Sequence, residues 1–497
     1  MRVLLLSSIL LLVACQRLEG AASVAPDPPC RELRWSGVPH RGNVILVVSD
    51  TTRRDRLGIY GGPARTPVFD GFARRNLYFE NASSQAPWTK PAVATLLTGL
   101  YPSQHGVRSH PNLRRGRTAL KSDVLPASLV TLPEVLSAAG FQTAAVVSNP
   151  WLTEGLGFEQ GFESYSDDFA SRHAPGREVS EAALRWLDRR SNGRPFFLYL
   201  HYMDSHRPYP PIAEERLERR REVIEEDHRP LSSQARRDIG IMARLADGRP
   251  AKAAGLPVNL ALIELAYDGG VKEFDAALGV LLDGLARREV LRDSAVLVLS
   301  DHGEALYRRG WGGHGSTLYD GQIAIPLAAQ LPGVATRGAV SCPVGSIDVL
   351  PSLCVYLGLD CPQPIFGTSF LSPPRRKDGR SPRYLVSEGV IGKPEHRSIR
   401  NRDYKLIYQP YGGPGEERLG RSPDPWALFD LSEDPSETRD LLDEEPRDAE
   451  AEAAFEVLAD RLRQGVPPVD APTPEQVEID DETRRRLEGL GYVDSPR

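Results

Sequence analysis

The chain has 497 residues, a net charge of -6 at pH 7, 26% charged residues and 40% hydrophobic residues. This balance lacks the basic surplus of a nucleic-acid-binding protein, and no nucleic acid is expected as a partner. The length allows one large domain, or a large domain with a smaller appendage.

The first 15 residues, MRVLLLSSILLLVAC, have the pattern of an export signal. Arg2 precedes an apolar run that is too short to span a bilayer. The ending Leu-Val-Ala-Cys resembles a bacterial lipobox, which predicts lipidation at Cys15 and a membrane-anchored protein in the periplasm or cell envelope. An ordinary signal peptide is the alternative. Residues 16–42 are expected to form a tether, and export would permit a disulfide between Cys354 and Cys361.

Four apolar runs further along the chain each lead into polar residues; they cover residues 43–51, 142–150, 194–209 and 294–304. Continuous apolar runs of this kind favour strands of a parallel sheet that is buried on both faces. Helical patterns lie between them, over residues 131–140, 179–190 and 271–290. The alternation predicts an α/β sandwich with a mostly parallel central sheet.

The composition also suggests domain boundaries. We expect a catalytic domain over residues 43–380, with a charged, partly helical surface insertion at residues 212–260. Short antiparallel strands are expected in a small C-terminal α+β subdomain, residues 381–445. Residues 446–497 are expected to be a helical tail, with one helix near the end of the chain that stops at a glycine.

Asp50 and Asp301 share a setting, because each follows an apolar, β-branched run and a serine. In open α/β sheets, ligands bind outside the carboxyl ends of the strands, where both side chains should lie. Together with His302 they form a candidate site for one divalent metal ion. Oxygen ligands alone would favour calcium or magnesium, whereas the imidazole favours zinc or manganese.

The stretch QAPWTKPAVATLLTG, residues 85–99, predicts a helix that begins near Thr89. Thr89 is expected to cap this helix. It is also expected to bind the metal ion and to act as a nucleophile, because a cation lowers the pKa of a bound hydroxyl. The helix N-terminus and Lys90 would hold an anionic ester oxygen. Asn149, at the end of another strand, is expected to line the same pocket.

These motifs resemble the sulfatase family of the alkaline phosphatase superfamily. TKPAVATLLTGLYPSQHG is similar to the family's nucleophile segment, and VILVVSDTTRRD and LVLSDHGEAL are similar to its metal-binding strands. YLHYMDSHRPY resembles a segment that ends in a substrate-binding histidine, here His206, and GWGGHGSTLYDGQIAIPL carries His314. The resemblance covers about residues 43–442 and implies an alkaline-phosphatase-like fold and a metal-dependent ester hydrolase.

Three positions depart from the family pattern. Sulfatases convert a Cys or Ser to formylglycine, which Thr89 cannot become; the motif arginine is Val93, and the usual second aspartate is Thr51. What remains resembles the threonine branch of the superfamily, which includes nucleotide phosphodiesterases and lipid-linked phosphoethanolamine and phosphoglycerol transferases. Asp204 and His206 match a second metal site only in part, so one metal ion is favoured.

The resemblance thus implies that Thr89 attacks an anionic phosphate ester, or less favourably a sulfate ester, of a glycan, lipid or small molecule. His206 and His314 would neutralise the non-bridging oxygens, and one of them would protonate the leaving group. The alternatives are a formylglycine-independent sulfuric ester hydrolase and a non-catalytic binder of an anionic glycan or lipid. His201 is expected to be a buried structural histidine, and His105 and Arg53 are also assigned structural roles.

Overall fold

The computed structural model describes residues 33–109, 121–170, 174–190, 193–246, 255–310, 312–371, 383–393, 395–410, 425–469 and 473–489. The expected signal sequence with Cys15, and residues 16–32 of the expected tether, lie outside these ranges. Within the described ranges, no helix is long and apolar enough to cross a membrane.

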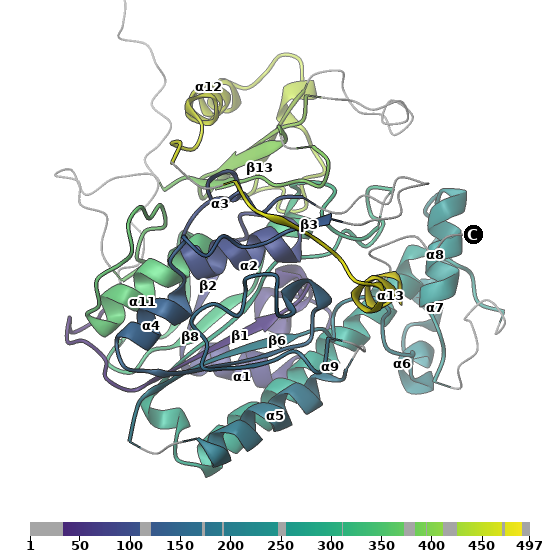
Figure 1. Cartoon of the computed structure of the whole chain (residues 1–497). Coiled ribbons are helices and arrows are strands. Elements are labelled where there is room, and N and C mark those ends of the chain that lie inside the picture. Colours follow the sequence, from purple (N-terminus) through teal and green to yellow (C-terminus); the bar gives the residue numbers. More distant parts are fainter. Residues whose placement is uncertain are drawn as a thin grey trace, which may run out of the picture.

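An eight-stranded, mostly parallel sheet forms the centre of the molecule, which confirms the predicted α/β architecture (Figure 1). The strands lie in the order β5-β4-β6-β1-β7-β8-β2-β9, and only the two pairs that include β8 are antiparallel. Their bounds are β1 Asn43–Ser49, β2 Leu77–Ser83, β4 Gln142–Val147, β5 Ser164–Ser166, β6 Phe196–Tyr202, β7 Ser294–Ser300, β8 Leu327–Gln330 and β9 Gly338–Gly345.

β1 shows why the sequence forms a central strand. Ile45 and Val47 join one hydrophobic cluster, whereas Leu46 and Val48 join another. Because successive side chains of a strand point to opposite faces, a strand covered on both sides has an unbroken apolar sequence. Two sets of helices provide the cover (Figure 1): α1 Pro67–Arg75, α5 Gly176–Arg189 and α9 Leu260–Arg287 on one face, and α2 Thr89–Thr98, α4 Leu132–Ala138 and α11 Val349–Leu357 on the other.

The charged segment expected at residues 212–260 contains three short helices, α6 Glu214–Glu218, α7 Arg221–Glu226 and α8 Ser233–Met242. Its few apolar side chains, among them Leu217, Ile224 and Ile239, are buried in the same cluster as α9. Helix α9 begins at Leu260, earlier than the predicted start at residue 271, because this cluster continues along its first turns.

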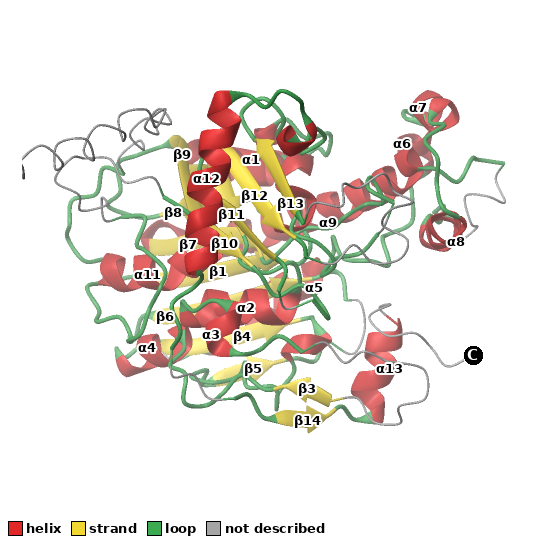
Figure 2. Ribbon diagram, turned by 90° about the horizontal axis from the view of Figure 1, so that it is seen from above, coloured by secondary structure: helices red, strands yellow, loops and turns green. Residues whose placement is uncertain are grey.

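A smaller antiparallel sheet follows the main domain, as predicted; its strands are β10 Leu385–Ser387, β11 Arg397–Arg400, β12 Tyr404–Tyr408 and β13 Trp426–Asp430. Helix α12, Ala449–Gln464, packs on this sheet (Figure 2). We expected this helix in a tail that begins at residue 446. The structure instead places it with the sheet, because Leu458 and Leu462 share an apolar cluster with Ile399 and Leu406.

The end of the chain differs from the predicted single helix. A short strand, β14 Gln476–Glu478, pairs with β3 Lys121–Asp123, and α13 Asp481–Gly489 follows it. The side chain of Asp480 accepts a hydrogen bond of 2.7 Å from the backbone N–H of Thr483. This contact at the first turn explains why the helix begins only after Asp480.

The cysteines also differ from the expected pairing. Cys354 and Cys361 are free thiols in the structure, and a hydrogen bond joins their side chains. Cys342 is disulfide-bonded.

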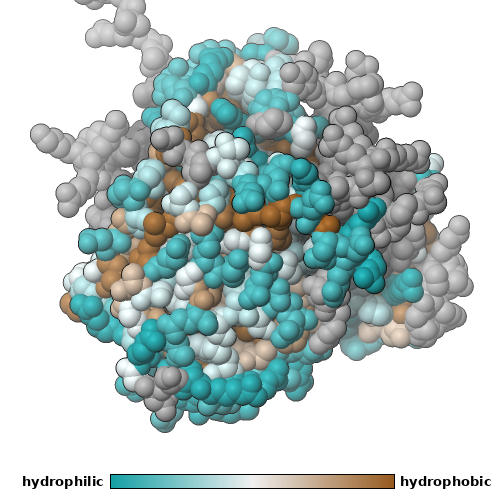
Figure 3. Space-filling model, viewed as in Figure 1, coloured by the Kyte–Doolittle hydropathy of each residue, from teal (hydrophilic) through white to brown (hydrophobic). Residues whose placement is uncertain are grey.

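Most apolar side chains of the described residues lie inside the protein. Only Val38, Val130, Val223 and Val457 are large hydrophobic residues with strong exposure in the described ranges. Figure 3 shows a mainly hydrophilic face with one hydrophobic band across its middle. A change at one of the exposed valines is therefore expected to leave the core unaltered.

A buried ion cluster connects the smaller sheet to the main domain. The Nζ atom of Lys405 in β12 lies 2.6 Å from Oδ1 of Asp320 and 2.6 Å from Oε1 of Glu437, and all three side chains are buried. We expect Lys405→Met to lower the free energy of unfolding by about 3–5 kcal/mol, because it leaves the buried carboxylate of Glu437 without its cation and Asp320 with Arg400 alone, at 3.2 Å. Urea titration would measure this change. The control is Lys121→Met at an exposed position, and a loss for Lys405→Met no larger than that of the control would contradict the prediction.

Candidate metal centre and active site

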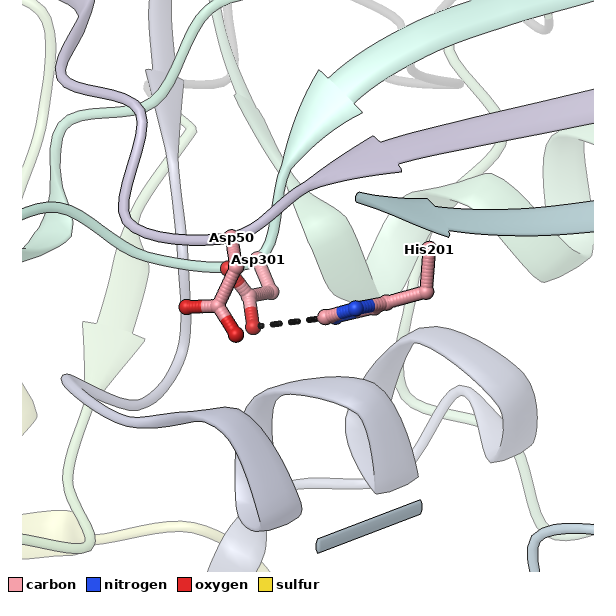
Figure 4. A group of neighbouring side chains, drawn as sticks. All are labelled: Asp50, His201 and Asp301. Atoms are coloured by element: carbon pink, nitrogen blue, oxygen red, sulfur yellow. Dashed lines mark ion pairs between the residues drawn. The ribbon is translucent and has the colours of Figure 1, made fainter. Parts of the chain in front are cut away.

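Asp50, His201 and Asp301 come together at the carboxyl end of the central sheet (Figure 4). Asp50 follows β1, Asp301 follows β7, and His201 lies near the end of β6, which with β7 flanks β1 in parallel register. One ligand atom from each residue lies within 4.8 Å of the other two, and all three side chains are buried. The structure thus brings together the two aspartates that share the strand–Ser–Asp setting.

His302 completes this group of ligand atoms. Its Nε2 atom lies 3.5 Å from Oδ1 of Asp50 and 3.5 Å from Oδ2 of Asp301. The other ring nitrogen, Nδ1, lies 2.9 Å from the carbonyl oxygen of Gly303. A proton on Nδ1 would donate to this carbonyl, so that the Nε2 lone pair faces the carboxylates, the arrangement that a metal-binding histidine needs.

The donor atoms fit a divalent cation. Oδ1 of Asp50, Oδ2 of Asp301 and Nε2 of His201 are buried without a hydrogen-bond partner among the described residues, although such atoms are normally satisfied. Burial, together with the nearby charge of Asp301, raises the pKa of Asp50 to about 7. Two buried carboxylates at this distance repel each other, and a bound cation would offset that repulsion.

His201 was expected to have a structural role, but it lies with the metal-ligand candidates, so a ligand role is now the alternative. Its strand register explains its position: His201 is paired with Val48 of β1, and Asp50 lies two residues beyond Val48. Residues two apart in a strand point to the same face, so the two side chains project toward the same place. An imidazole inside an otherwise apolar strand was the signal in the sequence.

The raised pKa of Asp50 predicts a pH-dependent metal affinity. Below about pH 7 a cation must displace the proton of Asp50, so the apparent association constant is expected to fall about tenfold per pH unit. Calorimetric titration of zinc at pH 8, 7 and 6 would measure it, and an affinity that does not change with pH would contradict the prediction.

The raised pKa of Asp50 also affects the metal-free protein. Its free energy of unfolding should fall as pH rises from about 4 to 7, because the folded state binds the proton of Asp50 more tightly than the unfolded state does.

Thr89 is the first residue of α2 and does not cap the helix. The residue at the cap position is Trp88, and no side chain caps the helix at this end. The predicted capping role of Thr89 is therefore wrong. Its backbone already has the helical conformation, which leaves its side chain available for contacts outside the helix.

The hydroxyl of Thr89 faces the metal-ligand candidates. Its Oγ1 atom lies 3.4 Å from Oδ2 of Asp50 and 3.2 Å from Nε2 of His302. Asn149 stands beside it, with Nδ2 at 3.3 Å from Oγ1 of Thr89 and 2.5 Å from Oδ2 of Asp50. All four side chains are buried. This is the position in which the sequence interpretation expected a nucleophile and Asn149.

Two further histidines extend the site. The ring of His314 lies 4.6 Å from that of His302, and the ring of His206 lies 5.1 Å from that of His314, between centroids. The carboxylate of Glu304 contacts His314, with Oε2 3.3 Å from Nδ1. The sequence analysis named both histidines but missed Glu304, although an acidic residue two positions after a metal-ligand histidine was a visible signal.

Lys90 and Asp204 have other contacts. The ammonium group of Lys90 donates hydrogen bonds to Oγ of Ser122 and to the carbonyl oxygen of Asp123, and the described contacts do not join it to the carboxylates of the site. We therefore no longer assign Lys90 to substrate binding. Oδ1 of Asp204 accepts a hydrogen bond of 2.8 Å from the backbone N–H of Gly176 at the start of α5.

The loop after β1 has a strained backbone at Thr51, and side chains from other elements hold it in place. Thr51, which stands where the family has its second aspartate, has a φ of 57°, a rare conformation for a β-branched residue. Asp301 accepts from its N–H at 3.3 Å, and the hydroxyl of Tyr267 in α9 donates to its carbonyl at 2.6 Å. Tyr267 also accepts from the N–H of Arg53. The sequence analysis missed Tyr267, because α9 is far from β1 in the chain.

Comparison with known proteins shows the family to which the chain belongs. The model of the Sulfatase family matches residues 42–359. The chain belongs to the sulfatase family. N-acetylglucosamine-6-O-sulfatase of Bacteroides thetaiotaomicron is 22% identical over 81% of this chain and 83% of that protein. Arylsulfatase A of Bos taurus is 24% identical, with the same coverage of 81% and 83%.

Solved structures support the fold. The phosphonate monoester hydrolase of Agrobacterium radiobacter aligns with a TM-score of 0.61 and 20% identity, over 85% of this chain and 95% of that one. A structure solved in complex with its substrate, D-glucosamine-2-N,6-O-disulfate, aligns with a TM-score of 0.65 and 20% identity, over 85% and 97% of the two chains. The chain is thus a sulfatase-like ester hydrolase with an alkaline-phosphatase-like fold.

Proposed function

We propose that this family member is a metal-dependent hydrolase or transferase that acts on anionic esters, with phosphate-type esters preferred over sulfate esters, through Thr89 as the nucleophile. The observation that carries the proposal is the position of the Thr89 hydroxyl, between Asp50, His302 and Asn149 at 3.2–3.4 Å. A threonine at this position cannot supply the formylglycine of the family's sulfate chemistry.

One divalent cation would be held by Asp50, His201, Asp301 and His302. Two carboxylates with two imidazoles favour zinc or manganese over calcium or magnesium. When bound, such a cation lowers the pKa of an adjacent hydroxyl and neutralises developing charge. The buried ligand atoms without partners described above support this assignment.

The side chains of the site have distinct roles in the proposed reaction. Oδ2 of Asp50 accepts the hydroxyl hydrogen of Thr89, while the amide of Asn149 holds the attacking oxygen in place. Oγ1 of Thr89 forms a bond to phosphorus as the ester bond to the leaving alcohol breaks. His206 and His314 neutralise the non-bridging oxygens, and one of them donates a proton to the leaving group. Water or an acceptor alcohol then releases the group from Thr89.

Sulfate-ester hydrolysis without formylglycine is the second candidate. The names of the relatives favour it, since they include sulfatases of N-acetylglucosamine and of aryl esters. A glycan that carries a phosphate or sulfate ester is accordingly one proposed substrate, beside an anionic lipid or small molecule. The non-catalytic alternative is weakened, because the metal-ligand candidates lie close to two candidate anion-binding histidines, His206 and His314.

We also propose that the protein is exported and anchored to a membrane through a lipid at Cys15. The basis is the N-terminal sequence alone. Metabolic labelling with a fatty acid would test the anchor, and a Cys15→Ser variant that still carries the label would overturn it.

The test of function is a panel of nitrophenyl esters: sulfate, phosphate, phosphodiester and phosphonate. Each would be assayed with zinc, manganese and calcium added separately to the metal-free protein. Turnover of a phosphorus ester that depends on added metal supports the proposal. Turnover of the sulfate ester alone would replace it with the second candidate, and a protein that binds metal but turns over none of the four esters would contradict it for these substrates.

A further inference from the structure

We propose that the C-terminal segment, residues 473–489, is a strap that positions the nucleophile from two sides. This inference rests on the proposed role of Thr89. The segment lies far from Thr89 in the sequence, but β14 and α13 return to the main domain beside β3, as Figures 1 and 2 show. Two chains of contacts lead from it to the neighbours of the Thr89 hydroxyl.

The first chain passes through β3. Gln476 and Val477 of β14 pair with Asp123 and Ser122 of β3, and the side chain of Gln476 donates a hydrogen bond of 2.8 Å to Oδ1 of Asp123. Ser122 Oγ and the Asp123 carbonyl are in turn the acceptors for the ammonium group of Lys90. Lys90 directly follows Thr89 in α2, so this chain ends one residue from the proposed nucleophile.

The strap shares the support of β3 with one neighbouring segment, because the backbone N–H groups of Arg108 and Ser109 donate hydrogen bonds of 2.9 and 2.6 Å to Oδ2 of Asp123. β3 has three residues, and within the described ranges β14 is its one strand partner. A strand pair this short is not stable alone and needs the surrounding contacts. The side chain of Lys90 is fully buried. If β14 detached, the acceptors of this buried amine would lose their fixed positions.

The second chain passes through the 3₁₀ turn η3, Pro150–Leu152. Helix α13 packs against this turn, and Leu487 of α13 is fully buried. Asn149 caps the turn, because its Oδ1 accepts a hydrogen bond of 2.8 Å from the N–H of Trp151. The same side chain uses its amide group to contact Asp50 and Thr89. The turn therefore fixes the orientation of Asn149, and α13 supports the turn.

The two chains of contacts reach the Thr89 hydroxyl by separate routes, one through the backbone of α2 and one through the amide of Asn149. A small displacement of an attacking group lowers the rate steeply, whereas substrate binding by other residues is retained. Detachment of the strap is therefore expected to lower kcat far more than it raises KM. Gln476 and Leu487 are positioning residues, since neither contacts the reacting atoms.

The experiment compares Leu487→Asp and Gln476→Ala in the full chain with Val457→Asp, which makes the same kind of change at an exposed site on α12. Steady-state kinetics on the preferred ester give kcat and KM, and elemental analysis gives the bound metal. Mass spectrometry follows the rate at which an amine-acylating reagent modifies Lys90. For Leu487→Asp we expect kcat to fall about tenfold to a hundredfold with KM changed less than about threefold. We also expect Lys90 to become at least about tenfold more reactive while metal content is retained, because burial protects it in the parent protein.

Gln476→Ala should show the same changes at smaller size, and Val457→Asp should show none. Wild-type kcat together with unreactive Lys90 in Leu487→Asp would overturn the proposal. If Leu487→Asp does not fold, Gln476→Ala decides by the same two criteria. Lys90 reactivity does not depend on the chemistry of Thr89, so a failure of the proposed function, seen as an active Thr89→Ala variant, can be told from a failure of the strap.

Discussion

Thr89→Ala is expected to lower kcat/KM on the preferred phosphorus ester by at least about a thousandfold, because the variant lacks the attacking oxygen. Thr89→Ser keeps a hydroxyl at the same backbone position and should retain activity to within about a hundredfold of the parent protein. Steady-state kinetics on both variants, at saturating metal, would measure the two effects. A burst of product followed by a slow phase would report the covalent intermediate on Thr89.

The matched control is Thr98→Ala, which removes a buried hydroxyl from the other end of α2. Thr98 donates a hydrogen bond of 2.7 Å to the carbonyl oxygen of Ala94 within the helix, so its loss tests packing and stability without touching the site. Activity of Thr89→Ala within tenfold of the control would mean that another oxygen attacks the ester. Retained metal in Thr89→Ala is also expected, because four other side chains are the proposed metal ligands.

The fold and most of the candidate site followed from local patterns and motifs in the sequence. Unbroken apolar runs predicted the parallel strands, and the repeated strand–Ser–Asp pattern predicted that Asp50 and Asp301 would meet, because parallel strands place their carboxyl ends at one edge. The position next to Asp301 pointed to His302, and the family motifs pointed to His206 and His314.

What the sequence did not predict depends on contacts between distant segments. Helix α9 supplies Tyr267 to the strained turn at Thr51, and β14 near the end of the described chain pairs with β3. Neither contact has a periodic or motif signature, because each is fixed by how layers of the fold stack. The start of α2 was predicted correctly, but the cap was not, because the position of a helix end to one residue depends on its surroundings.

His201 shows the same limit within a single strand. A histidine one residue from the end of an apolar strand fits a satisfied core residue and a metal ligand equally well by sequence. The strand register favours the ligand role, because His201 pairs with Val48 and therefore lies on the same face of the sheet as Asp50, two residues beyond Val48. Its Nε2 atom lies 3.6 Å from Oδ2 of Asp301.

His201→Ala is therefore expected to weaken zinc binding by at least about a hundredfold, since loss of a ligand should exceed the 10- to 100-fold cost of losing an outer contact. Turnover should fall in parallel. Added imidazole should restore part of the zinc affinity and part of the turnover, because it can fill the space that the His201 side chain leaves. Metal content after dialysis and a competition titration would measure the affinity.

His105→Ala is the matched control, because His105 is equally buried but bonds to Thr95 and Val107 within its own segment, with Nε2 3.1 Å from Oγ1 of Thr95. Both variants remove a buried imidazole and should lose stability for that reason. The two variants should differ in metal binding. His105→Ala should keep its metal, and added imidazole should not change its metal affinity or its turnover. Equal metal affinity in the two variants would return His201 to a structural role and leave Asp50, Asp301 and His302 as the metal ligands.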